Sequence, residues 1–408
     1  MNRRRFIKAT SALAGVNAIP FAGTLAALSA QSVFADDLNA QRKPILVAVE
    51  LSGGNDGLNS VVPYTDDAYY RHRPSIGIKS EALLKLDDAY GLNPGMLGFQ
   101  RLWQKDQLAI VHGCGYANPS YSHFNSMAYW HTGAPHTGSA FGWMGRVADQ
   151  LAAQRQDNML INIAASASLA VKSARHTPVV FDDPERFQRD YWMHDEAHRF
   201  PTHQGSTARS SNATRNFLHS VNQSAQASAQ RIRRAWRDYA TPIDYGIAPM
   251  DLPKVAACID AGLSTQLYHV AFRNNAFDTH VQQPALHQRL LSYACDGIYG
   301  FVQDLERLGQ ADRVVVMVYS EFGRRVPENA NLGTDHGSAN VMFLAGAPIQ
   351  GGHYGEPPSL TQLVDGDNLA HTTDFRRVYA TVVQDWLGVP ATSVLNAHAE
   401  PLSILRSA

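Results

Sequence analysis

The chain has 408 residues, of which 45% are hydrophobic and 17% are charged. This length allows one large domain or two ordinary ones, and the composition excludes disordered and fibrous proteins. The formal net charge of −1 gives no sign of a nucleic-acid-binding protein.

The first 35 residues have the layout of an export signal. A basic segment, Asn2–Lys8, precedes a weakly apolar stretch that ends with the small residue Ala35. The arginine pair followed by x-Phe-Ile-Lys resembles a twin-arginine signal, which the export machinery reads as an address. We predict cleavage after Ala35 and a periplasmic or extracellular protein without a membrane span. A retained membrane anchor is the alternative.

Removal of this signal would leave residues 36–408 as a single domain. That chain has 31 basic and 36 acidic residues, a net charge of −5, which again argues against partners such as nucleic acid. Its cysteines, Cys114, Cys258 and Cys295, have no CxxC spacing. We expect three buried thiols and no disulfide.

The first apolar run, Pro44–Leu51, predicts a buried strand that breaks into a glycine-rich segment containing Asp56. The glycines permit tight backbone geometry, which would hold Asp56 at the carboxyl edge of the sheet. A plain turn is the alternative interpretation of this segment.

A second strand is predicted at Leu108–Gly113, and Ser122 and His123 follow it where a helix should begin. A serine at a helix N-terminus is a plausible nucleophile, because the helix amides favour developing negative charge. The alternative is that Ser122 only caps the helix.

Residues 182–250 form a polar insertion between predicted strands, and helical periodicity runs through residues 212–239. We interpret the insertion as a lid over the site or, equally, as a surface excursion.

The strand Thr265–Phe272 is followed by Asp278 and His280. Residues two apart in an extended loop point to the same side, so this pair could bind one cation. A solvated loop pair is the alternative. The long amphipathic helix Leu286–Leu308 then leads to the next strand.

The most informative stretch begins at Val314 with an apolar strand that is followed by Glu321 and Arg324. A glycine-containing loop then brings Asp335 and His336. Ligands in open α/β sheets bind beyond the carboxyl ends of the strands, so these residues are candidate ligands or acid/base groups. A buried strand, Val341–Ala345, and a closing helix capped by Thr373 complete the pattern.

Carboxylates and imidazoles thus follow four separate strands. We expect them to converge on one edge of a doubly wound, mostly parallel α/β sheet sandwiched by helices. Such a set is what a two-cation site requires, because paired cations stabilise both the attacking and leaving oxygens of a displacement. Arg324 could bind an anionic group bidentately. Its alternative role is a salt bridge with Glu328 or Asp335.

Six motifs of the chain resemble those of the domain-of-unknown-function 1501 family, whose members are exported bacterial proteins grouped with the alkaline phosphatase and sulfatase superfamily. The resemblance extends from about residue 43 to residue 388. The motifs are Leu51–Asn59, Ser122–Phe124, Phe277–His280, Ser320–Arg324, Gly333–Gly337 and Thr373–Phe375.

The resemblance implies an alkaline phosphatase-like fold and hydrolysis of phosphate or sulfate esters. By position it implies a nucleophile at Ser122 and metal ligands at Asp56, Asp278, His280, Glu321 and His336. Two features depart from the superfamily pattern: Glu321 and Phe322 replace the usual Asp-His pair, and Asp278 and His280 are unusually close in sequence. We therefore expect one or two divalent cations, of zinc, calcium or magnesium, with His123 or Asp335 able to complete a second site.

The leading hypothesis is an exported, metal-dependent hydrolase of a small or polymeric anionic ester. A catalytically inactive binding or structural protein of the cell envelope, acting with a protein partner, is the main alternative, and Phe322 motivates it. Acyl transfer by a Ser-His-Asp triad is weaker, because no G-x-S-x-G segment is present.

Overall fold

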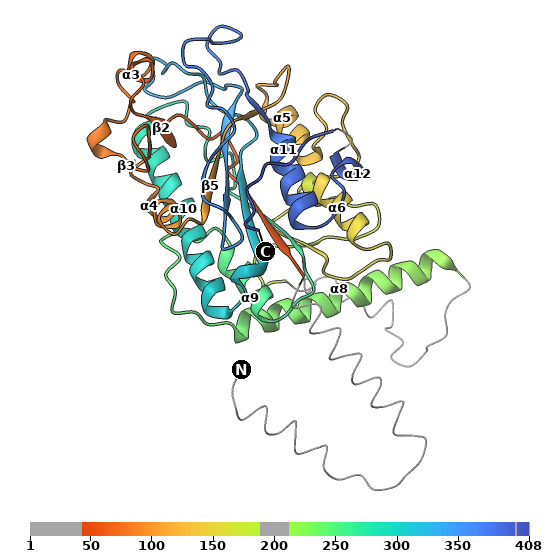
Figure 1. Cartoon of the computed structure of the whole chain (residues 1–408). Coiled ribbons are helices and arrows are strands. Elements are labelled where there is room, and N and C mark those ends of the chain that lie inside the picture. The colour runs from red at the N-terminus through yellow and green to blue at the C-terminus, as the bar shows by residue number, and fades with distance from the viewer. Residues whose placement is uncertain (1–42, 188–211, 396–397, 408) are drawn as a thin grey trace, which may run out of the picture. The chain divides into compact units, whose positions relative to one another are not determined.

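A nine-stranded sheet passes through the centre of the molecule (Figure 1), in the computed structural model, which describes residues 43–187, 212–395 and 398–407. Its strands are β1 (Ile45–Glu50), β5 (Leu108–Gly115), β6 (Leu160–Ile163), β7 (Val179–Phe181), β8 (Leu267–Ala271), β9 (Val314–Tyr319), β10 (Asn340–Ala345), β11 (Gly352–Tyr354) and β12 (Thr373–Asp374). Their order is β11-β5-β10-β9-β1-β8-β6-β7, with β12 beside β5.

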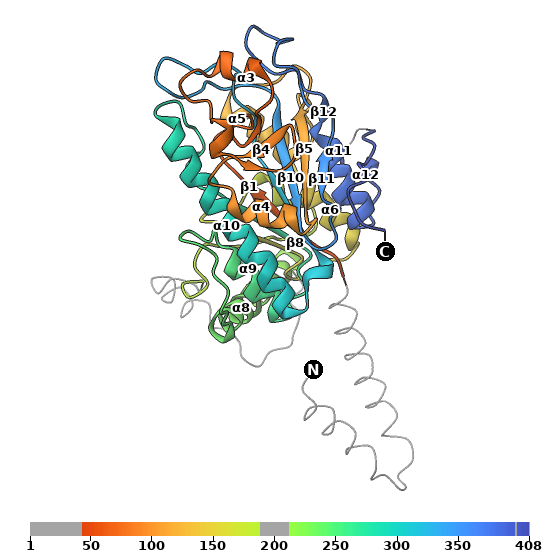
Figure 2. The same cartoon turned by 60° about the vertical axis from the view of Figure 1, so that its left-hand side comes forward.

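Helices cover both faces of this sheet. The helices of the described residues are α3 (Asp67–His72), α4 (Leu97–Gln104), α5 (His123–Thr132), α6 (Trp143–Leu151), α8 (Ala213–Asp238), α9 (Leu252–Asp260), α10 (Gln283–Leu308), α11 (Phe375–Ala380) and α12 (Thr392–Leu395), of which α3 and α8 lie at opposite ends of the sheet (Figures 1 and 2). Short 3-10 turns lie at Ser80–Ala82, Leu169–Val171 and Ala311–Arg313, and a π-helical turn, Thr381–Trp386, continues α11. A small second sheet contains β2 (Val61–Pro63), β3 (Leu84–Lys85) and β4 (Tyr90–Leu92).

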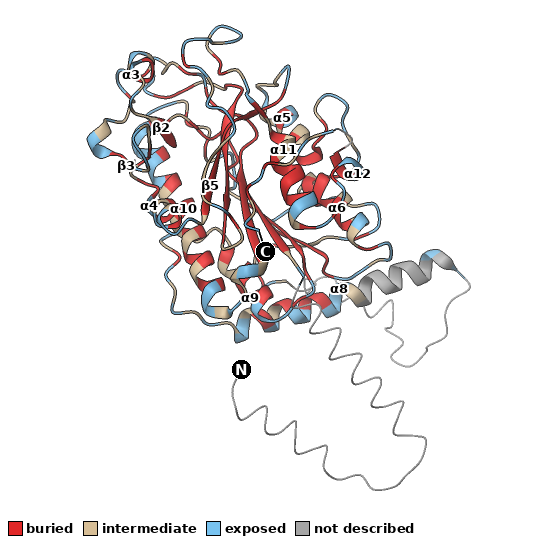
Figure 3. Ribbon diagram, viewed as in Figure 1, coloured by how far each residue is buried: buried red, intermediate tan, exposed pale blue. Residues whose placement is uncertain are grey.

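Alternation along β1 explains the two layers of helices. Val47 and Val49 pack with α4, α9 and α10 on one face, whereas Leu46 and Ala48 pack with α5, α6 and α11 on the other. Every residue of β1 is buried, as Figure 3 shows for the central strands. A strand covered on both faces must be apolar throughout, which is why the continuous apolar run predicted it correctly. The α/β, doubly wound fold class is confirmed.

Strand β10 is the exception to the parallel arrangement, because it runs antiparallel to both β5 and β9. The connection from β9 to β10, residues 320–339, contains no helix. A parallel neighbour requires a crossover, usually helical, whereas a loop that turns back gives an antiparallel pair. That loop carries the glycine-containing segment on which the site depends.

The predicted helix at residues 212–239 is present as α8, which contacts α9. Figures 1 and 2 both show α8 at the end of the sheet opposite α3. The described part of the insertion therefore forms no lid over the carboxyl ends of the strands, and residues 188–211 lie outside the described residues.

Two smaller predictions can be compared with the structure. The closing helix is capped by Asp374, whose side chain accepts a hydrogen bond from the Arg376 amide, so the prediction of a Thr373 cap is wrong. Cys114, Cys258 and Cys295 are buried and free, as expected.

The register of the sheet brings the site-bearing loops together. Glu50, the last residue of β1, is level with Ala271 of β8 on one side and with Tyr319 of β9 on the other. The segments that follow these three strands therefore emerge side by side. Residues from Pro44 onward form one compact unit. The predicted signal peptide lies outside the described residues, and among the helices that are described none is long and apolar enough to cross a membrane.

Candidate metal centre

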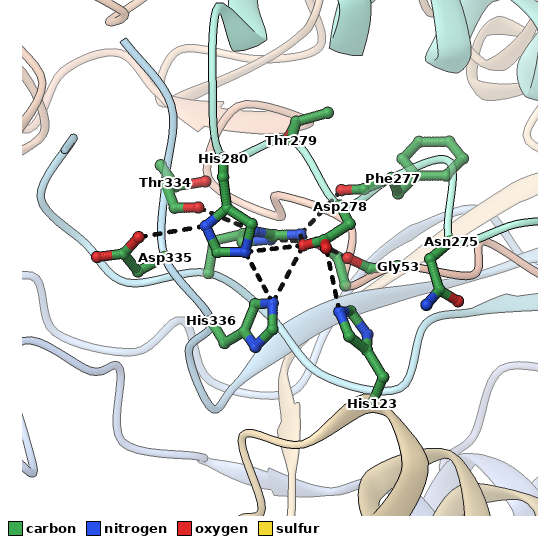
Figure 4. Close-up of polar contacts among 12 residues, drawn as sticks. Gly53, His123, Asn275, Phe277, Asp278, Thr279, His280, Thr334, Asp335 and His336 are labelled. Atoms are coloured by element: carbon green, nitrogen blue, oxygen red, sulfur yellow. Dashed lines mark hydrogen bonds and ion pairs between the residues drawn. The ribbon is translucent and has the colours of Figure 1, made fainter. Parts of the chain in front are cut away.

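Two loops and the start of a helix bring three imidazoles to one aspartate at the carboxyl edge of the sheet. Asp278 and His280 lie between β8 and α10, and His336 lies between β9 and β10. His123 is the first residue of α5. Figure 4 shows the three histidine rings pointing toward the Asp278 carboxylate.

The ring nitrogens and the carboxylate are spaced like ligands of one cation. Asp278 Oδ1 lies 3.0 Å from His336 Nε2 and 2.9 Å from His280 Nε2, which is itself 2.9 Å from His336 Nε2. His123 Nε2 lies 3.4 Å from Asp278 Oδ2. Ligands at about 2.0–2.1 Å from a tetrahedral zinc ion are roughly 3.3 Å apart. The spacing therefore fits a small divalent cation.

The hydrogen bonds of the three rings assign their protons. Nδ1 donates to Glu321 Oε1 in His123 (2.7 Å), to the Tyr121 carbonyl oxygen in His336 (2.7 Å) and to Asp335 Oδ1 in His280 (3.2 Å). A carbonyl or carboxylate oxygen can only accept, so Nδ1 carries the proton and Nε2 of a neutral ring keeps its lone pair. All three Nε2 atoms face Asp278.

One of these ring nitrogens has no hydrogen bond among the described residues. His123 Nε2 is buried and lies 3.4 Å from Asp278 Oδ2. A buried polar atom without a hydrogen bond costs free energy unless something else binds it. Because carboxylates and carbonyls that orient ligand imidazoles are the usual support of a metal site, the donor set fits a cation.

The local electrostatics favour the charged carboxylate. Burial raises the pKa of Asp278, but the hydrogen bond and the charge of Arg324 outweigh it and lower that pKa to about 2. Burial also lowers the pKa of His336, which keeps the ring in its neutral, ligating form. The hydrogen bond to Glu321 raises the pKa of His123, so a cation would have to displace a proton there.

Phe322 forms an apolar floor under two of the rings. Its ring centroid lies 4.9 Å from that of His123 and 4.7 Å from that of His336. Gly54, at φ +74°, is the residue that leaves room for this ring, because a Cβ there would overlap it. Phe322 therefore fixes the planes of two candidate ligands, although it ligates nothing itself.

Glu321 supports the site from behind. Its oxygens accept hydrogen bonds from the Gly53 amide at 2.9 and 3.1 Å, and from Ser320 Oγ at 3.1 Å, in addition to His123 Nδ1. The side chain is fully buried. These contacts occupy the Glu321 carboxylate, which therefore orients the candidate ligand His123 and is not itself a candidate ligand.

Arg324 faces protein acceptors on all sides. Its guanidinium donates to the carbonyl oxygens of Gly53, Gly54, Phe277 and Thr334 and to Asp278 Oδ1. Four of its five N–H groups are occupied in this way. Its ion pair is with Asp278 rather than with the predicted partners Glu328 or Asp335. We therefore assign it to holding the loops together rather than to binding an anionic group.

Asp56 does not join the histidines. It is fully buried, pairs with Arg73 at 2.7 Å and accepts hydrogen bonds from Gln283 and from the Asn59 amide. Burial raises the pKa of Asp56, but the Arg73 charge outweighs it and the net shift is downward. With these partners Asp56 has a structural role, and the ligand set needs no contribution from it.

Ser122 lies next to the cluster at the N-cap position of α5. Its side chain is exposed and makes no capping hydrogen bond. The capping interpretation therefore does not describe this hydroxyl, which is free at the N-terminus of a ten-residue helix.

A second buried cluster, which the sequence did not suggest, contains Glu50, His131, His269 and Tyr319. Glu50 Oε2 lies 2.6 Å from His131 Nε2 and accepts a hydrogen bond from Tyr319 Oη at 3.0 Å. The Asn162 amide donates to His269 Nδ1, so the proton of that ring is on Nε2, facing Tyr319. A protonated nitrogen cannot ligate, and we interpret the cluster as a hydrogen-bond network. The feature of the sequence that could have revealed this network is Glu50, a charged residue in an otherwise apolar strand.

The fold and the site together define an α/β protein with a candidate metal centre at the carboxyl edge of its sheet. The chain belongs to the family described as "Protein of unknown function (DUF1501)", which it matches over residues 43–384. This confirms the family resemblance. A search of curated proteins finds no match.

Several solved structures are similar at low identity. They include PsFucS1 sulfatase from Pseudoalteromonas sp. (12% identity, 94% of this chain and 75% of that chain covered, TM-score 0.38). The phosphonate monoester hydrolase SpPMH from Silicibacter pomeroyi is similar at 9% identity, with 89% and 78% covered and a TM-score of 0.36. Ps i-CgsB in complex with k-i-k-neocarrahexaose is similar at 11% identity, with 88% and 75% covered and a TM-score of 0.38. Scores of this size leave the chemistry to the residues of this chain.

Proposed function

We propose that this protein is a hydrolase of phosphate or sulfate esters that depends on one divalent cation. The cation would be held by Asp278, His123 and His336, with His280 as the fourth ligand. The observation that carries the proposal is the common orientation of the three rings: each Nδ1 is tied to an acceptor and each Nε2 faces Asp278.

Zinc suits this donor set best among zinc, calcium and magnesium. Imidazole nitrogens with one carboxylate are ligands that zinc prefers, whereas calcium and magnesium take mainly oxygen ligands. The four side chains are between 21% and 37% exposed, so a substrate could reach them from solvent. Bound there, the cation would supply Lewis-acid stabilisation of negative charge on an ester oxygen.

The protein's own groups would supply attack and orientation. Ser122, with a free and exposed hydroxyl beside ligand His123, is the proposed nucleophile. The N-terminus of α5 favours negative charge on that hydroxyl. Glu321 and Phe322 would hold the His123 ring in place, and an in-line attack requires such fixed geometry. The Ser122 proton would pass to solvent as the new bond forms, and the leaving oxygen would take a proton from solvent. Water would then hydrolyse the phospho- or sulfo-serine and restore the Ser122 hydroxyl.

Export through the twin-arginine machinery remains part of the proposal. A folded protein with its metal already bound is a suitable cargo for that route, and the substrate would be a small or polymeric anionic ester of the periplasm or exterior. The basic segment Asn2–Lys8 supports this assignment.

A binding or structural role in the cell envelope is the second candidate. The observation that favours it is the saturation of Arg324 by protein acceptors, which leaves the guanidinium without the N–H pair needed for a bidentate anion. Stable recovery of a protein partner, together with unchanged function of Ser122→Ala, would support this candidate.

The test is hydrolysis of an aryl phosphate and an aryl sulfate by the zinc-loaded protein. We expect Ser122→Ala to abolish turnover while metal content stays unchanged, and His336→Asn to lose both. Ser292→Ala, which changes a serine on α10 that bonds only within its own helix, is the matched control. A folded, metal-loaded protein that is inert toward both esters would reject the hydrolase proposal.

A further inference from the structure

A cavity of about 70 Å³ lies among the segment after β1, strands β4 and β5 and the beginning of β10, and the ligand histidines do not line it. Most of its wall is apolar and is formed by Leu58, Val61, Pro63, Pro358, Leu360 and Leu369. Four polar side chains, Asp66, Tyr90, His112 and Asn340, also line it, and the Asn340 amide is already bonded to the backbone of Asn55, Phe322 and Val341. An apolar cavity with a few convergent polar groups is the usual form of a small-ligand site.

The hydrogen bonds of His112 determine which nitrogen is available. His112 is 4% exposed, and its Nε2 lies 2.8 Å from His353 Nδ1. His353 Nε2 makes no hydrogen bond but lies 3.0 Å from Asp87 Oδ2, and the negative charge of that carboxylate favours the His353 proton on Nε2. His353 Nδ1 must then accept, and His112 Nε2 must donate. His112 Nδ1 is therefore an acceptor.

This acceptor has no partner within the described part of the chain. Burial lowers the pKa of His112 to about 3 and also lowers the pKa of His353, which keeps both rings neutral. A neutral His112 with its proton on Nε2 offers the cavity a lone pair. Only a donor can satisfy it.

Asp66 and Tyr90 also favour a ligand that donates hydrogen bonds. Asp66 accepts a hydrogen bond from the Ala68 amide with Oδ1, and Oδ2 has no partner among the described residues. The hydroxyl of Tyr90 also lacks a partner there. Burial, and then the charges of Asp87 and Asp66, raise the pKa of Tyr90, so its hydroxyl stays neutral. The lining thus combines acceptors, negative charge and an aromatic ring.

We propose that this cavity binds a primary ammonium group on a short aliphatic body. The ammonium donates to Asp66 Oδ2 and His112 Nδ1, the ring of Tyr90 adds a cation–π contact, and the apolar wall covers the carbon atoms. At about 30 Å³ per water molecule, the cavity has room for two or three water-sized groups, which is the size of ethylammonium. A free amine and the end of a longer side chain both carry such an ammonium group.

Calorimetric titration of the full-length protein tests this proposal with ethylammonium, and with ethanol and acetate as neutral and anionic probes. We expect saturable binding of ethylammonium alone. An additional titration with Nα-acetyl-lysine amide separates the two sources: binding identifies the ammonium of a longer side chain, and its absence identifies a small free amine. No saturable ethylammonium binding, or equal binding of ethanol, overturns the proposal.

Asp66→Asn is the decisive variant, because asparagine keeps the oxygen that accepts the Ala68 amide and removes only the charge. The matched control is Asp67→Asn, an exposed residue of the same first helical turn that does not line the cavity. We expect ethylammonium affinity to fall at least tenfold in Asp66→Asn and to change less than twofold in Asp67→Asn. Equal affinities in the two variants would overturn the assignment. Zinc content should be the same in both, which separates this site from the metal centre.

Discussion

Glu321→Gln is the substitution that probes the support of the metal centre most selectively. The Glu321 carboxylate is fully buried and accepts from three donors: His123 Nδ1 at 2.7 Å, the Gly53 amide and Ser320 Oγ. Glutamine has one accepting oxygen and one donating amide, so the amide must face at least one of these donors. Loss of such a carboxylate behind a ligand imidazole lowers metal affinity by about 10- to 100-fold. This corresponds to about 1.4–2.8 kcal/mol.

Zinc affinity measured by competition with a chromophoric chelator is the assay. Glu328→Gln is the matched control, because Glu328 also accepts backbone amide hydrogen bonds, from Ser75 and Ile76, but contacts no ligand histidine. We expect a weaker zinc complex only in Glu321→Gln. Equal zinc affinities in the two variants would refute the role of Glu321 in orienting His123.

Three further predictions concern stability, each measured by urea unfolding. Asp56→Asn should lower the free energy of unfolding by about 3–5 kcal/mol, because it leaves the buried Arg73 charge without its partner. The zinc stoichiometry should stay unchanged, and a loss of zinc would show that Asp56 is a ligand after all. Burial lowers the pKa values of His112 and His287 to about 3 and about 4, so below pH 6.5 the unfolded chain binds more protons than the folded one. Stability should therefore fall on acidification from pH 6.5 to pH 4, by up to about 1.4 kcal/mol per pH unit for each histidine, and a flat profile would contradict this sign. Tyr319→Phe should cost about 1–3 kcal/mol, because the buried Glu50 loses a donor, and an unchanged midpoint would contradict the proposed network.

Apolar runs made most of the fold predictable from the sequence. Strands such as β1 and β9 are buried on both faces, so they read as continuous apolar segments with clear ends. The direction of β10 was not predictable from its own residues, because it depends on whether the preceding loop crosses over or turns back. The place of the insertion was not predictable either, since its packing on α9 is a tertiary contact.

The candidate site was predictable in its location but only partly in its ligands. Asp278, His280 and His336 follow strand ends that the register places together, and local pattern was sufficient to select them. Asp56 also follows a strand end, yet its nearest charge is Arg73, a contact that no local pattern reveals. The same holds for Glu321, whose partner His123 is 198 positions away in the sequence.

The packing of Phe322 changes the interpretation of this residue. In the sequence it stands where a ligand was expected and suggests a lost site. In the structure its ring packs against His123 and His336, so it supports two of the proposed ligands of a single cation.

Metal stoichiometry tests the central claim most directly. The protein, purified and dialysed, should contain one divalent cation per chain by elemental analysis, and His336→Asn and His123→Asn should contain none while remaining folded by circular dichroism. A folded wild-type protein that holds no cation after exposure to zinc, or that holds two, would contradict the single-cation centre.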